Sequence, residues 1–368
     1  MKSIYEKYDL TEVINASGKM TALGVSKYPD EAIEAQQFGG KNFFVMDQLA
    51  ENVGAYVAKL IGAEDAHIVS SASAGIAQSV AAVIGKGSMY HLHHPFSKKI
   101  TQREIIVPKG HNVDYGAPVE TMVELGGGVV VEAGYANKCT PALIEEMITD
   151  ETAAILYIKS HHTVQKSMLS VEEAVDVAHR HNLPLIIDAA AEQDLHKYLE
   201  SGADLVIYSG AKALEGTTSG LVIGAGNLVK WVRMQSYGIG RAMKIGKENI
   251  LGLAAAIELY LEKGAEPGEE MKARLSPFIE ELSKIPGINV SVAQDPAGRE
   301  IYRAKVVVRD DAPLNALELI EELKKGELAI YTREHQANNG IIEFDIRSVN
   351  EEEMDKIIIR MKEILTKK

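Results

Sequence analysis

Three short apolar runs in the middle of the chain constrain its fold more than any other feature. They cover residues 154–158 (AILYI), 185–187 (LII) and 205–208 (LVIY). Each has the length of a strand, and none alternates with polar residues, which is typical of a strand covered on both faces. Parallel sheets bury their strands in this way because their crossover helices lie on both faces. The runs therefore predict an α/β fold with a mostly parallel sheet flanked by helices.

The segment between the first two runs has the signals of a crossover helix. Ser170 and Glu173 have the spacing of a capping box, and apolar residues from Ala174 to Ala178 recur at helical spacing. Pro184 ends this pattern just before the next run. Because ligands of such sheets bind beyond the carboxyl ends of the strands, we expect the functional site where these runs end.

The length of 368 residues predicts more than one hydrophobic core. Helical patterning over residues 248–262 ends at a stretch with glycine and proline, after which strands and helices resume with different spacing. We therefore expect a large domain over residues 46–262 and a smaller α+β domain over residues 263–368. Residues 1–45 contain several glycines and little regular patterning, so we expect an arm that packs against the small domain or a partner subunit.

Charge and cysteine content exclude several classes of protein. The net charge of −13 disfavours broad nucleic-acid binding, which needs a basic surface. Cys139 is the only cysteine, so the chain has no internal disulfide framework, and a reducing compartment suits it. Residues 1–10 lack the apolar centre of a signal peptide, and no apolar run approaches the ~20 residues of a membrane helix. We expect a cytoplasmic protein that binds neither nucleic acid nor membrane.

A lysine and an aspartate stand at two of the expected strand ends. Lys212 follows the run 205–208, where burial would lower the pKa of its amine and make it a Schiff-base nucleophile. Asp188 ends the preceding run, where a carboxylate would balance the charge of a pyridinium nitrogen. A lysine chosen at random is a solvated surface residue, but the pairing with Asp188 favours a cofactor site.

A turn of small residues adds a third element. Residues 70–75 (SSASAG) follow the strand-like residues 66–69 and open an apolar helix. Backbone amides at such a helix start bind phosphate, and Ser73 would add a hydroxyl donor. Serine at a helix start is usually an ordinary cap, so the turn indicates a phosphate site only in combination with Asp188 and Lys212.

These elements, in this order, resemble fold-type-I pyridoxal-phosphate enzymes. The resemblance rests on the turn of small residues, on Asp188, and on residues 209–212 (SGAK) followed by residues 219–224 (SGLVIG). Residues 13–18 (VINASG) and 241–244 (RAMK) are similar to stretches of bacterial selenocysteine synthases. The arrangement of nearly the whole chain is most similar to the sugar-acid relatives in that group, the D-glucosaminate-6-phosphate ammonia-lyases.

The resemblance implies pyridoxal 5'-phosphate as the cofactor. Lys212 would carry it as a Schiff base, Asp188 would pair with the ring nitrogen, and Ala190 would lie under the ring. His111 would stack over the ring and act with Lys212 and Asp188 in catalysis; the alternative is a loop histidine without that role. The implied cofactor-binding residues are Ala72, Ser73, Ala74, His111, Asp188, Ala190, Ser209, Lys212, Thr218 and Ser219.

Two further places hold candidate substrate-binding residues. Ser160 and His161 follow the end of the run 154–158 and would face the cofactor or the substrate. The resemblance also implies an arginine for the substrate carboxylate in the second domain. Arg347 is the first candidate and Arg333 the alternative, because a guanidinium fork suits a carboxylate.

A cationic stretch near the end of the large domain is a candidate phosphate site. Arg241, Lys244 and Lys247 are spaced by three residues and could share one helix face, where Arg241 and Lys244 would bind a substrate phosphate. The alternative is a solvated face paired with Glu248. The histidine clusters lack carboxylate or cysteine ligands at metal spacing, so we expect no metal.

The resemblance implies a lyase that removes water and ammonia from a phosphorylated amino sugar acid, D-glucosaminate 6-phosphate, to give 2-keto-3-deoxygluconate 6-phosphate. The alternative is a selenium or sulfur transferase that acts on an activated amino acid or a carrier-bound seryl group. Selenocysteine synthases carry an additional amino-terminal region for transfer RNA, whereas this sequence starts close to the core and is acidic. These departures favour the lyase. The resemblance also implies a homodimer or higher homo-oligomer.

Overall fold

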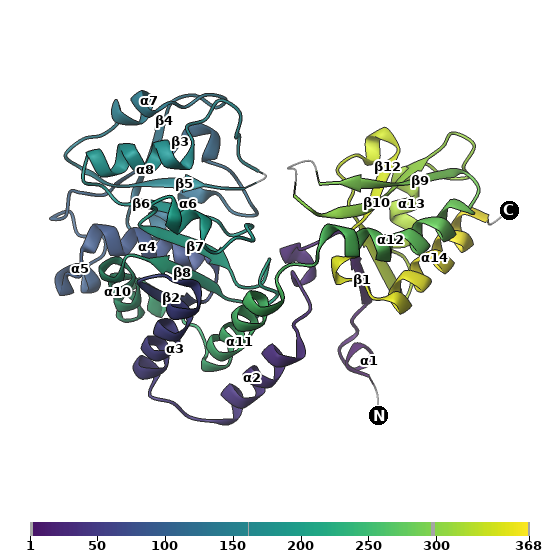
Figure 1. Cartoon of the computed structure of the whole chain (residues 1–368), viewed down its shortest axis with the longest axis horizontal. Coiled ribbons are helices and arrows are strands. Elements are labelled where there is room, and N and C mark those ends of the chain that lie inside the picture. The colour runs from purple at the N-terminus through teal and green to yellow at the C-terminus, as the bar shows by residue number, and fades with distance from the viewer. Residues whose placement is uncertain (1–2, 161, 296–298, 367–368) are drawn as a thin grey trace. The chain divides into compact units, whose positions relative to one another are not determined.

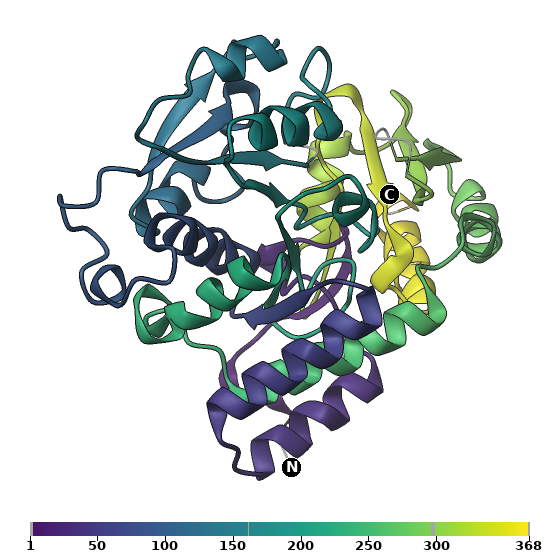
Figure 2. The same ribbon diagram turned by 60° about the vertical axis from the view of Figure 1, so that its left-hand side comes forward.

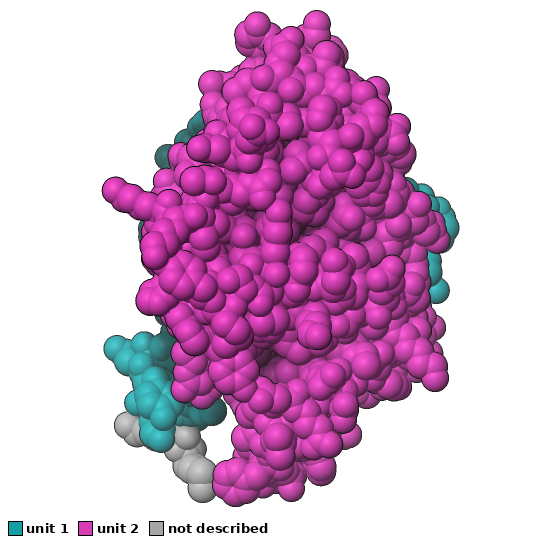
Figure 3. Space-filling model, turned by 90° about the vertical axis from the view of Figure 1, so that its left-hand side faces the viewer, with its two compact units in different colours: residues 1–27, 266–368 teal, residues 28–265 magenta. Residues whose placement is uncertain are grey.

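The computed structural model of the chain describes residues 3–160, 162–295 and 299–366. Its contacts divide the chain into two compact units, coloured separately in Figure 3. Unit 2 is Tyr28–Ala265, and unit 1 combines Met1–Lys27 with Glu266–Lys368. Each unit has a hydrophobic core of its own. No helix in the described residues is long and apolar enough to cross a membrane.

Unit 2 is built on a seven-stranded sheet (Figure 1). The strand order is β2-β8-β7-β6-β5-β3-β4, and only β8 runs against the others, since it is antiparallel to both of its neighbours. The mostly parallel sheet predicted from the apolar runs is therefore confirmed. The strands are β2 (Asp65–Val69), β3 (Glu104–Pro108), β4 (Val129–Ala133), β5 (Thr152–Ile158), β6 (Leu185–Asp188), β7 (Leu205–Ser209) and β8 (Gly220–Gly224).

The predicted crossover helix is present as α8 (Val171–Arg180). It begins with the predicted capping box: Ser170 Oγ accepts from the backbone N–H of Glu173 (3.1 Å), and the Glu173 carboxylate accepts from that of Ser170 (2.7 Å). The other helices of unit 2 are α2 (Asp30–Lys41), α3 (Met46–Ile61), α4 (Ala72–Gly85), α5 (Met89–His93), α6 (Val119–Leu125), α7 (Pro141–Glu145), α9 (Lys197–Glu200), α10 (Gly226–Met234) and α11 (Lys247–Lys263).

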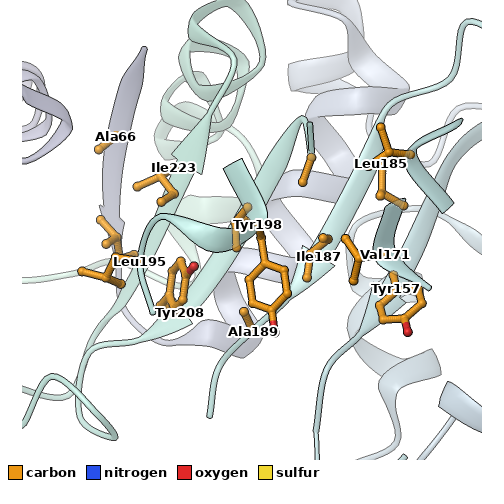
Figure 4. Packing of buried hydrophobic residues seen from close by; sticks show 14 of the residues in the cluster. Ala66, Tyr157, Val171, Leu185, Ile187, Ala189, Leu195, Tyr198, Tyr208 and Ile223 are labelled. Carbon is orange, nitrogen blue, oxygen red and sulfur yellow. The ribbon is translucent and has the colours of Figure 1, made fainter. Parts of the chain in front are cut away.

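The sheet of unit 2 is buried on both faces. All seven residues of β5 are buried, as expected for a strand covered on both sides. One core contains Tyr157, Ile187 and Tyr208 (Figure 4). The phenol of Tyr157 donates to the Leu169 carbonyl (3.2 Å) and that of Tyr208 to the Asp194 carbonyl (2.8 Å), which satisfies two hydroxyls inside this core. A second core includes apolar residues of α4, α6 and α10.

Helices α2, α3 and α11 lie side by side (Figures 1 and 2). The predicted arm over residues 1–45 is divided between the units: residues up to Lys27 belong to unit 1, whereas α2 packs on α11 in unit 2. Gly39 permits this close packing, because a Cβ there would lie 2.8 Å from Glu248 Cα. Beside this helix group Phe38 is 59% and Phe43 100% exposed, which leaves an apolar surface on α2 and the loop that follows it.

Unit 1 contains two small sheets and the helices that cover them. Strand β1, from the amino-terminal segment, pairs in parallel with β11, and β12-β10-β9 form an antiparallel sheet. The elements are α1 (Ile4–Tyr8), β1 (Glu12–Ala16), α12 (Gly268–Ser283), β9 (Ile288–Gln294), β10 (Tyr302–Val308), α13 (Ala316–Leu323), β11 (Leu328–Thr332), β12 (Ile341–Phe344) and α14 (Glu351–Thr366).

A buried ion network stabilises unit 1. Arg303, on β10, is 1% exposed and donates to Asp295 (3.0 Å) and to Asp345 (3.1 Å). Asp345 also accepts two hydrogen bonds from the Arg347 guanidinium, at 2.9 and 2.8 Å. Burial would raise the pKa of Asp345, but the hydrogen bonds and charges of Arg347 and Arg303 outweigh it and hold this pKa below its usual value.

Asp345→Ala would leave Arg303 buried with part of its counter-charge missing. We expect this variant to lower the free energy of unfolding by about 3–5 kcal/mol, the typical cost of breaking a buried ion pair. Urea unfolding curves measure the change. Asp311→Ala is the matched control, because the Arg309–Asp311 pair is exposed and its loss should cost less than ~1 kcal/mol. Equal effects of the two substitutions would contradict the stabilising role of the buried network.

Candidate functional site

The candidate functional residues of unit 2 named below gather at one edge of its sheet. Strands β2, β3, β5, β6 and β7 are mutually parallel, so their carboxyl ends meet at this edge. Asp188 ends β6, Lys212 follows β7, Ser160 follows β5, and helix α4 follows β2. Because β8 runs in the opposite direction, it starts at this edge, directly after Ser219. We call this region the carboxyl edge.

Asp188 and Lys212 form the electrostatic centre of the carboxyl edge. Asp188 is 6% exposed, and its Oδ1 accepts from the backbone N–H of Ala190 (3.0 Å). Burial raises the pKa of Asp188 to about 6, although the Ala190 hydrogen bond and the charge of Lys212 act in the opposite direction. Burial also lowers the pKa of the Lys212 amine, against the attraction of Asp188. The surroundings therefore disfavour charge on both groups, and a further cation beside Asp188 would stabilise its carboxylate.

The turn that carries Lys212 is fixed against the start of β8. The backbone N–H of Gly210 donates to the Ser219 carbonyl (2.9 Å), and a Cβ at Gly210 would lie 2.2 Å from Ser219 Oγ. Ser219 is 2% exposed, and its hydroxyl donates to the Thr217 carbonyl (2.7 Å). Thr218, between them, is exposed. The Ser219 hydroxyl is therefore engaged within the turn, whereas the side chain of Thr218 reaches solvent.

Helix α4 begins at the carboxyl edge with unsatisfied backbone donors. Ser71 is its cap, since its Oγ accepts from the N–H of Ala74 (3.0 Å). No described residue accepts a hydrogen bond from the N–H groups of Ala72 and Ser73, which therefore suit an anion. Gly220 allows β8 to approach this turn, because a Cβ there would lie 2.7 Å from the Ala72 nitrogen.

Tyr115 also faces α4 and is not among the residues predicted from the sequence. Its hydroxyl lies 3.2 Å from Ser73 Oγ. Burial raises the pKa of the phenol, the hydrogen bond to Ser73 lowers it, and the negative charge of Asp188 raises it. The only signal in the sequence was an aromatic residue in the loop after a buried strand, so its place beside Ser73 depends on the tertiary fold.

His111 lies in the same loop but is completely buried. Its Nε2 donates to the Val164 carbonyl (3.2 Å), and its Nδ1 accepts from the backbone N–H of Ile158 (3.4 Å). Its ring meets that of Tyr157 edge-on, with centroids 4.5 Å apart. Burial lowers the pKa of His111 to about 4, so the ring is neutral at physiological pH. These hydrogen bonds lie in the plane of the ring and fix its orientation, and the stacking role of His111 remains a prediction beside the loop-histidine alternative.

The remaining predicted residues of the carboxyl edge lie at strand ends or just beyond them. Ser209 ends β7, and its backbone N–H donates to the Ala190 carbonyl (3.4 Å). Ser160 Oγ accepts from the backbone N–H of His162 (3.2 Å). His161, predicted beside Ser160, lies outside the described residues.

Arg241 and Lys244 do not share a helix face. Arg241 ends the 3-10 turn Ile239–Arg241, Lys244 lies in a loop, and Lys247 begins α11. A turn at residues 242–243 separates Arg241 from Lys244, and Gly246 separates Lys244 from α11. The Lys247 ammonium donates to three backbone carbonyls at the end of α2 and just beyond it. Arg241 and Lys244 line a cavity of about 760 Å³ beside β2. Among the described residues, no ion pair joins either of them to Glu248.

Arg347 and Arg333 lie in unit 1. Arg347 is paired with Asp345, and the predicted VINASG motif packs against this pair: Gly18 has φ +97°, and a Cβ there would lie 3.0 Å from Asp345 Oδ2. Arg333 Nε lies 3.6 Å from the Glu343 carboxylate and has no hydrogen-bond partner. The guanidinium of Arg347 is thus oriented by a carboxylate, and that of Arg333 keeps an unsatisfied donor.

Comparisons with known proteins agree with this arrangement. The model of the family described as SelA: L-seryl-tRNA selenium transferase matches residues 13–275. The chain is 45% identical to D-glucosaminate-6-phosphate ammonia lyase of Salmonella typhimurium over 98% of both chains. It is 36% identical to 5'-C-glycyluridine monooxygenase-decarboxylase of a Streptomyces species, over 98% of this chain and 92% of the relative.

Solved structures show that the chain has the fold of these relatives. A structure of D-glucosaminate-6-phosphate ammonia-lyase superimposes with a TM-score of 0.94 at 44% identity, over 99% of this chain and 98% of that chain. An aspartate aminotransferase of Thermotoga maritima superimposes with a TM-score of 0.53 at 14% identity, over 99% and 94% of the two chains, which shows the fold alone. The predicted fold-type-I architecture is confirmed.

The raised pKa of Asp188 predicts that ionisation of this carboxyl lowers the free energy of unfolding of the cofactor-free protein. An unfolded aspartate ionises near pH 3.8 and the folded one near 6, so stability falls as the pH rises between these values. The penalty approaches ~3 kcal/mol at pH 7, at 1.36 kcal/mol per pKa unit. Asp188→Asn removes it and keeps an oxygen acceptor for the Ala190 N–H.

We therefore expect cofactor-free Asp188→Asn to gain stability relative to wild type as the pH rises from 4.5 to 7.5. Urea unfolding of both proteins across this range measures the difference. Asp176→Asn, at an exposed position, is the matched control for the change from aspartate to asparagine. A constant difference for Asp188→Asn would mean that burial does not control the ionisation of this carboxyl.

Proposed function

The chain belongs to the SelA (L-seryl-tRNA selenium transferase) family, and within it we propose that the protein is a pyridoxal-phosphate-dependent ammonia-lyase. Its substrate is a phosphorylated amino sugar acid, D-glucosaminate 6-phosphate, and its products are ammonia and 2-keto-3-deoxygluconate 6-phosphate. The observation that carries this proposal is the 45% identity to a D-glucosaminate-6-phosphate ammonia lyase over 98% of both chains. The chemistry of the carboxyl edge supports it.

The residues of the carboxyl edge fit pyridoxal 5'-phosphate. Asp188 is a buried carboxylate whose pKa is raised despite the charge of Lys212, so a protonated ring nitrogen would add a counter-charge that stabilises it. The N–H groups of Ala72 and Ser73, with the hydroxyl of Tyr115 close by, suit the phosphate. Lys212, with a lowered pKa, suits covalent attachment. The proposed cofactor set is completed by Ala74, Ala190, Ser209, Thr218 and Ser219.

Lys212 and Asp188 carry the proton chemistry of the proposed reaction. When bound, the cofactor supplies an electron sink for the carbon that bears the substrate amine. Lys212 accepts the proton of that carbon, because burial favours its uncharged amine. The ammonium so formed donates a proton to the hydroxyl that leaves the adjacent carbon as water. Asp188 keeps the ring nitrogen protonated. The enamine product is then hydrolysed, which consumes one water and releases ammonia. The water lost and the water consumed cancel, so the net change is the loss of ammonia.

Cationic side chains bind the charged groups of the substrate. Arg347 is proposed for the carboxylate, with Arg333 as the alternative, since a guanidinium fork matches a carboxylate. Arg241 and Lys244 are proposed for the distal phosphate; both are exposed and line the same cavity. Ser160, at the end of β5, is proposed to contact the substrate.

A transferase that acts on an activated amino acid or a carrier-bound seryl group is the alternative, because the family model bears the name of such an enzyme. The lyase is favoured because the identity to the ammonia lyase is high along the whole chain. The net charge of −13 also disfavours an extended contact with transfer RNA.

We further propose that the protein forms at least a homodimer. The apolar side chains exposed on α2 and the loop that follows it, Phe38 and Phe43, support this proposal, since a single chain leaves them in water. Thr218, exposed beside the Lys212 turn, is proposed to serve the phosphate of a neighbouring subunit.

Lys212 is expected to be the lysine that carries the cofactor. Borohydride reduction of the cofactor-loaded protein, followed by peptide mapping, should find the reduced cofactor on Lys212 in the wild type and no label in Lys212→Ala, because only this amine has the required place. Lys197→Ala removes an exposed lysine and should retain the label. A label on any other lysine would overturn the assignment.

The wild-type protein is expected to release ammonia and a 2-keto acid from D-glucosaminate 6-phosphate. A panel of phosphorylated and free amino sugar acids, assayed for both products, tests this expectation. Asp188→Ala should lower kcat by several orders of magnitude, on the order of 10²–10⁴, and should not act mainly through KM, because it removes the partner of the ring nitrogen. Release of ammonia without keto acid, or no turnover of this substrate, would refute the proposed reaction.

A further inference from the structure

The buried ion network of unit 1 ends at the guanidinium of Arg347. Asp345 follows β12 directly, is completely buried, and accepts from Arg347 Nε and Nη2 at 2.9 and 2.8 Å. Its Oδ2 also accepts from Arg303 Nε (3.1 Å), and Arg303 Nη2 donates to Asp295 (3.0 Å). Because two hydrogen bonds to one carboxylate fix the plane of a guanidinium, the orientation of Arg347 depends on Asp345.

This network leads from the interior of unit 1 to a side chain that is partly exposed. The side chain of Arg303 is 1% exposed and that of Asp295 4%, whereas that of Arg347 is 18% exposed. Burial would raise the pKa of Asp295, but the hydrogen bonds and charges of Arg299 and Arg303 lower it to about 2. The pKa of Asp345 is also held below its usual value, so both carboxylates are ionised at neutral pH. Charged partners therefore hold Arg347 throughout the physiological range.

The amino-terminal motif VINASG packs against the same ion pair. The Ala16 carbonyl accepts from the backbone N–H of Asp345 (2.8 Å). Asn15 Oδ1 accepts from the backbone N–H of Ser17 (3.0 Å), and Asn15 Nδ2 donates to the Gly18 carbonyl (2.9 Å). The first of these bonds is that of an Asx turn. Both polar atoms of the Asn15 amide thus shape the turn that lies against Asp345.

Gly18 lies directly against the atoms that join the ion pair. Its φ of +97° is in the region that favours glycine, and a Cβ there would lie 3.0 Å from Asp345 Oδ2 and 3.4 Å from Arg347 Nη2. These two atoms are 2.8 Å apart in the ion pair. A side chain at this position would therefore displace the carboxylate or the guanidinium, so the glycine fixes the place of Arg347 as well as the course of the turn.

Arg333, the alternative for the substrate carboxylate, lacks comparable support. Its Nε lies 3.6 Å from the Glu343 carboxylate and has no hydrogen-bond partner among the described residues. A long side chain loses rotamer freedom when it binds a ligand, and a guanidinium that is already fixed loses less. The network therefore favours Arg347 over Arg333 as the group that binds a carboxylate.

We propose that Asp345 and the turn that ends at Gly18 are positioning residues, which orient the Arg347 guanidinium for the carboxylate of the substrate. Arg303 keeps Asp345 in place. The role of Arg347 itself rests on the proposed function. The positioning residues act only through the guanidinium, because a fork binds a carboxylate well only when the two planes are aligned. A change at Gly18 should therefore weaken contacts to the carboxylate and spare those to the rest of the substrate.

Gly18→Ala tests this proposal, since an Asp345 variant would also destabilise unit 1. Gly326→Ala is the matched control: its φ of +98° causes the same backbone strain, and no described atom lies within 4 Å of a Cβ there. Thermal unfolding curves should show that both variants are folded. Asn15→Ala, which removes the hydrogen bonds of the turn and adds no atom, is the second variant and should act in the same direction as Gly18→Ala.

Calorimetric titration of the cofactor-loaded protein with two unreactive analogues measures the effect. D-Gluconate 6-phosphate has the carboxylate but no amine, and D-glucitol 6-phosphate lacks the carboxylate. We expect Gly18→Ala to weaken gluconate binding about tenfold and to leave glucitol binding unchanged, because only the carboxylate contact is misaligned. KM for D-glucosaminate 6-phosphate should rise by about the same factor, with kcat nearly unchanged. Equal affinities of Gly18→Ala and Gly326→Ala for the gluconate would overturn the proposal.

Arg347→Ala separates a positioning role from a merely structural one. It should weaken gluconate binding by roughly 10–100-fold, whereas Arg309→Ala, at an exposed arginine of the same unit, should not. Added to Arg347→Ala, Gly18→Ala should cause no further loss, because its effect passes through that guanidinium. A further loss in the double variant, or a loss in Arg333→Ala in place of Arg347→Ala, would overturn the positioning role.

The positioning role and the proposed reaction fail in different ways, because the titrations need no turnover. Gluconate binding that depends on Gly18 and Arg347 in a protein without lyase activity would support the positioning role and refute the reaction. Lyase activity in a protein whose gluconate binding is unchanged by Arg347→Ala would refute the positioning role and leave the reaction.

Discussion

The unfavourable burial of Asp188 and Lys212 is the constraint on which the candidate site depends. Both groups carry charge in water, yet burial raises the pKa of the carboxyl and lowers that of the amine, and their mutual attraction does not compensate. A fold retains such a pair only where other interactions provide the free energy that offsets the cost of burying the two groups. The buried parallel strands that precede both residues do so, because their apolar side chains form the core of unit 2. The same instability makes the amine nucleophilic and leaves the carboxylate ready for a cation.

Close backbone packing fixes the groups around this pair. The single reversed strand, β8, starts where its neighbours end, and Gly210 and Gly220 let it approach both the Lys212 turn and the cap of α4. Strand β2 and helix α4 border both the carboxyl edge and the cavity beside β2. Their junction presents unsatisfied N–H groups at the carboxyl edge, and their outer side carries His67 and Gln78, which line the cavity beside β2.

The sequence by itself determined the architecture and placed Asp188 and Lys212 at neighbouring strand ends. Uninterrupted apolar runs predict buried parallel strands because a strand covered on both faces has no polar side. Strands β5, β6 and β7 contain those runs. The capping box at Ser170 predicted the start of α8 because capping is a local interaction between residues three apart. Asp188 and Lys212 could be paired in advance because strand order along the chain already places the ends of neighbouring parallel strands at one edge.

Only the tertiary structure decided which side chains occupy the space between those strand ends. His111 and Tyr115 stand in one loop, and only the histidine was predicted from the sequence. Packing buried the histidine against backbone groups and placed the tyrosine beside Ser73. The spacing of Arg241 and Lys244 suggested one helix face, whereas they line a cavity with His67 and Gln78, residues from distant parts of the chain. Local periodicity does not predict such contacts, because they form when elements far apart in sequence are brought together by burial of their apolar faces.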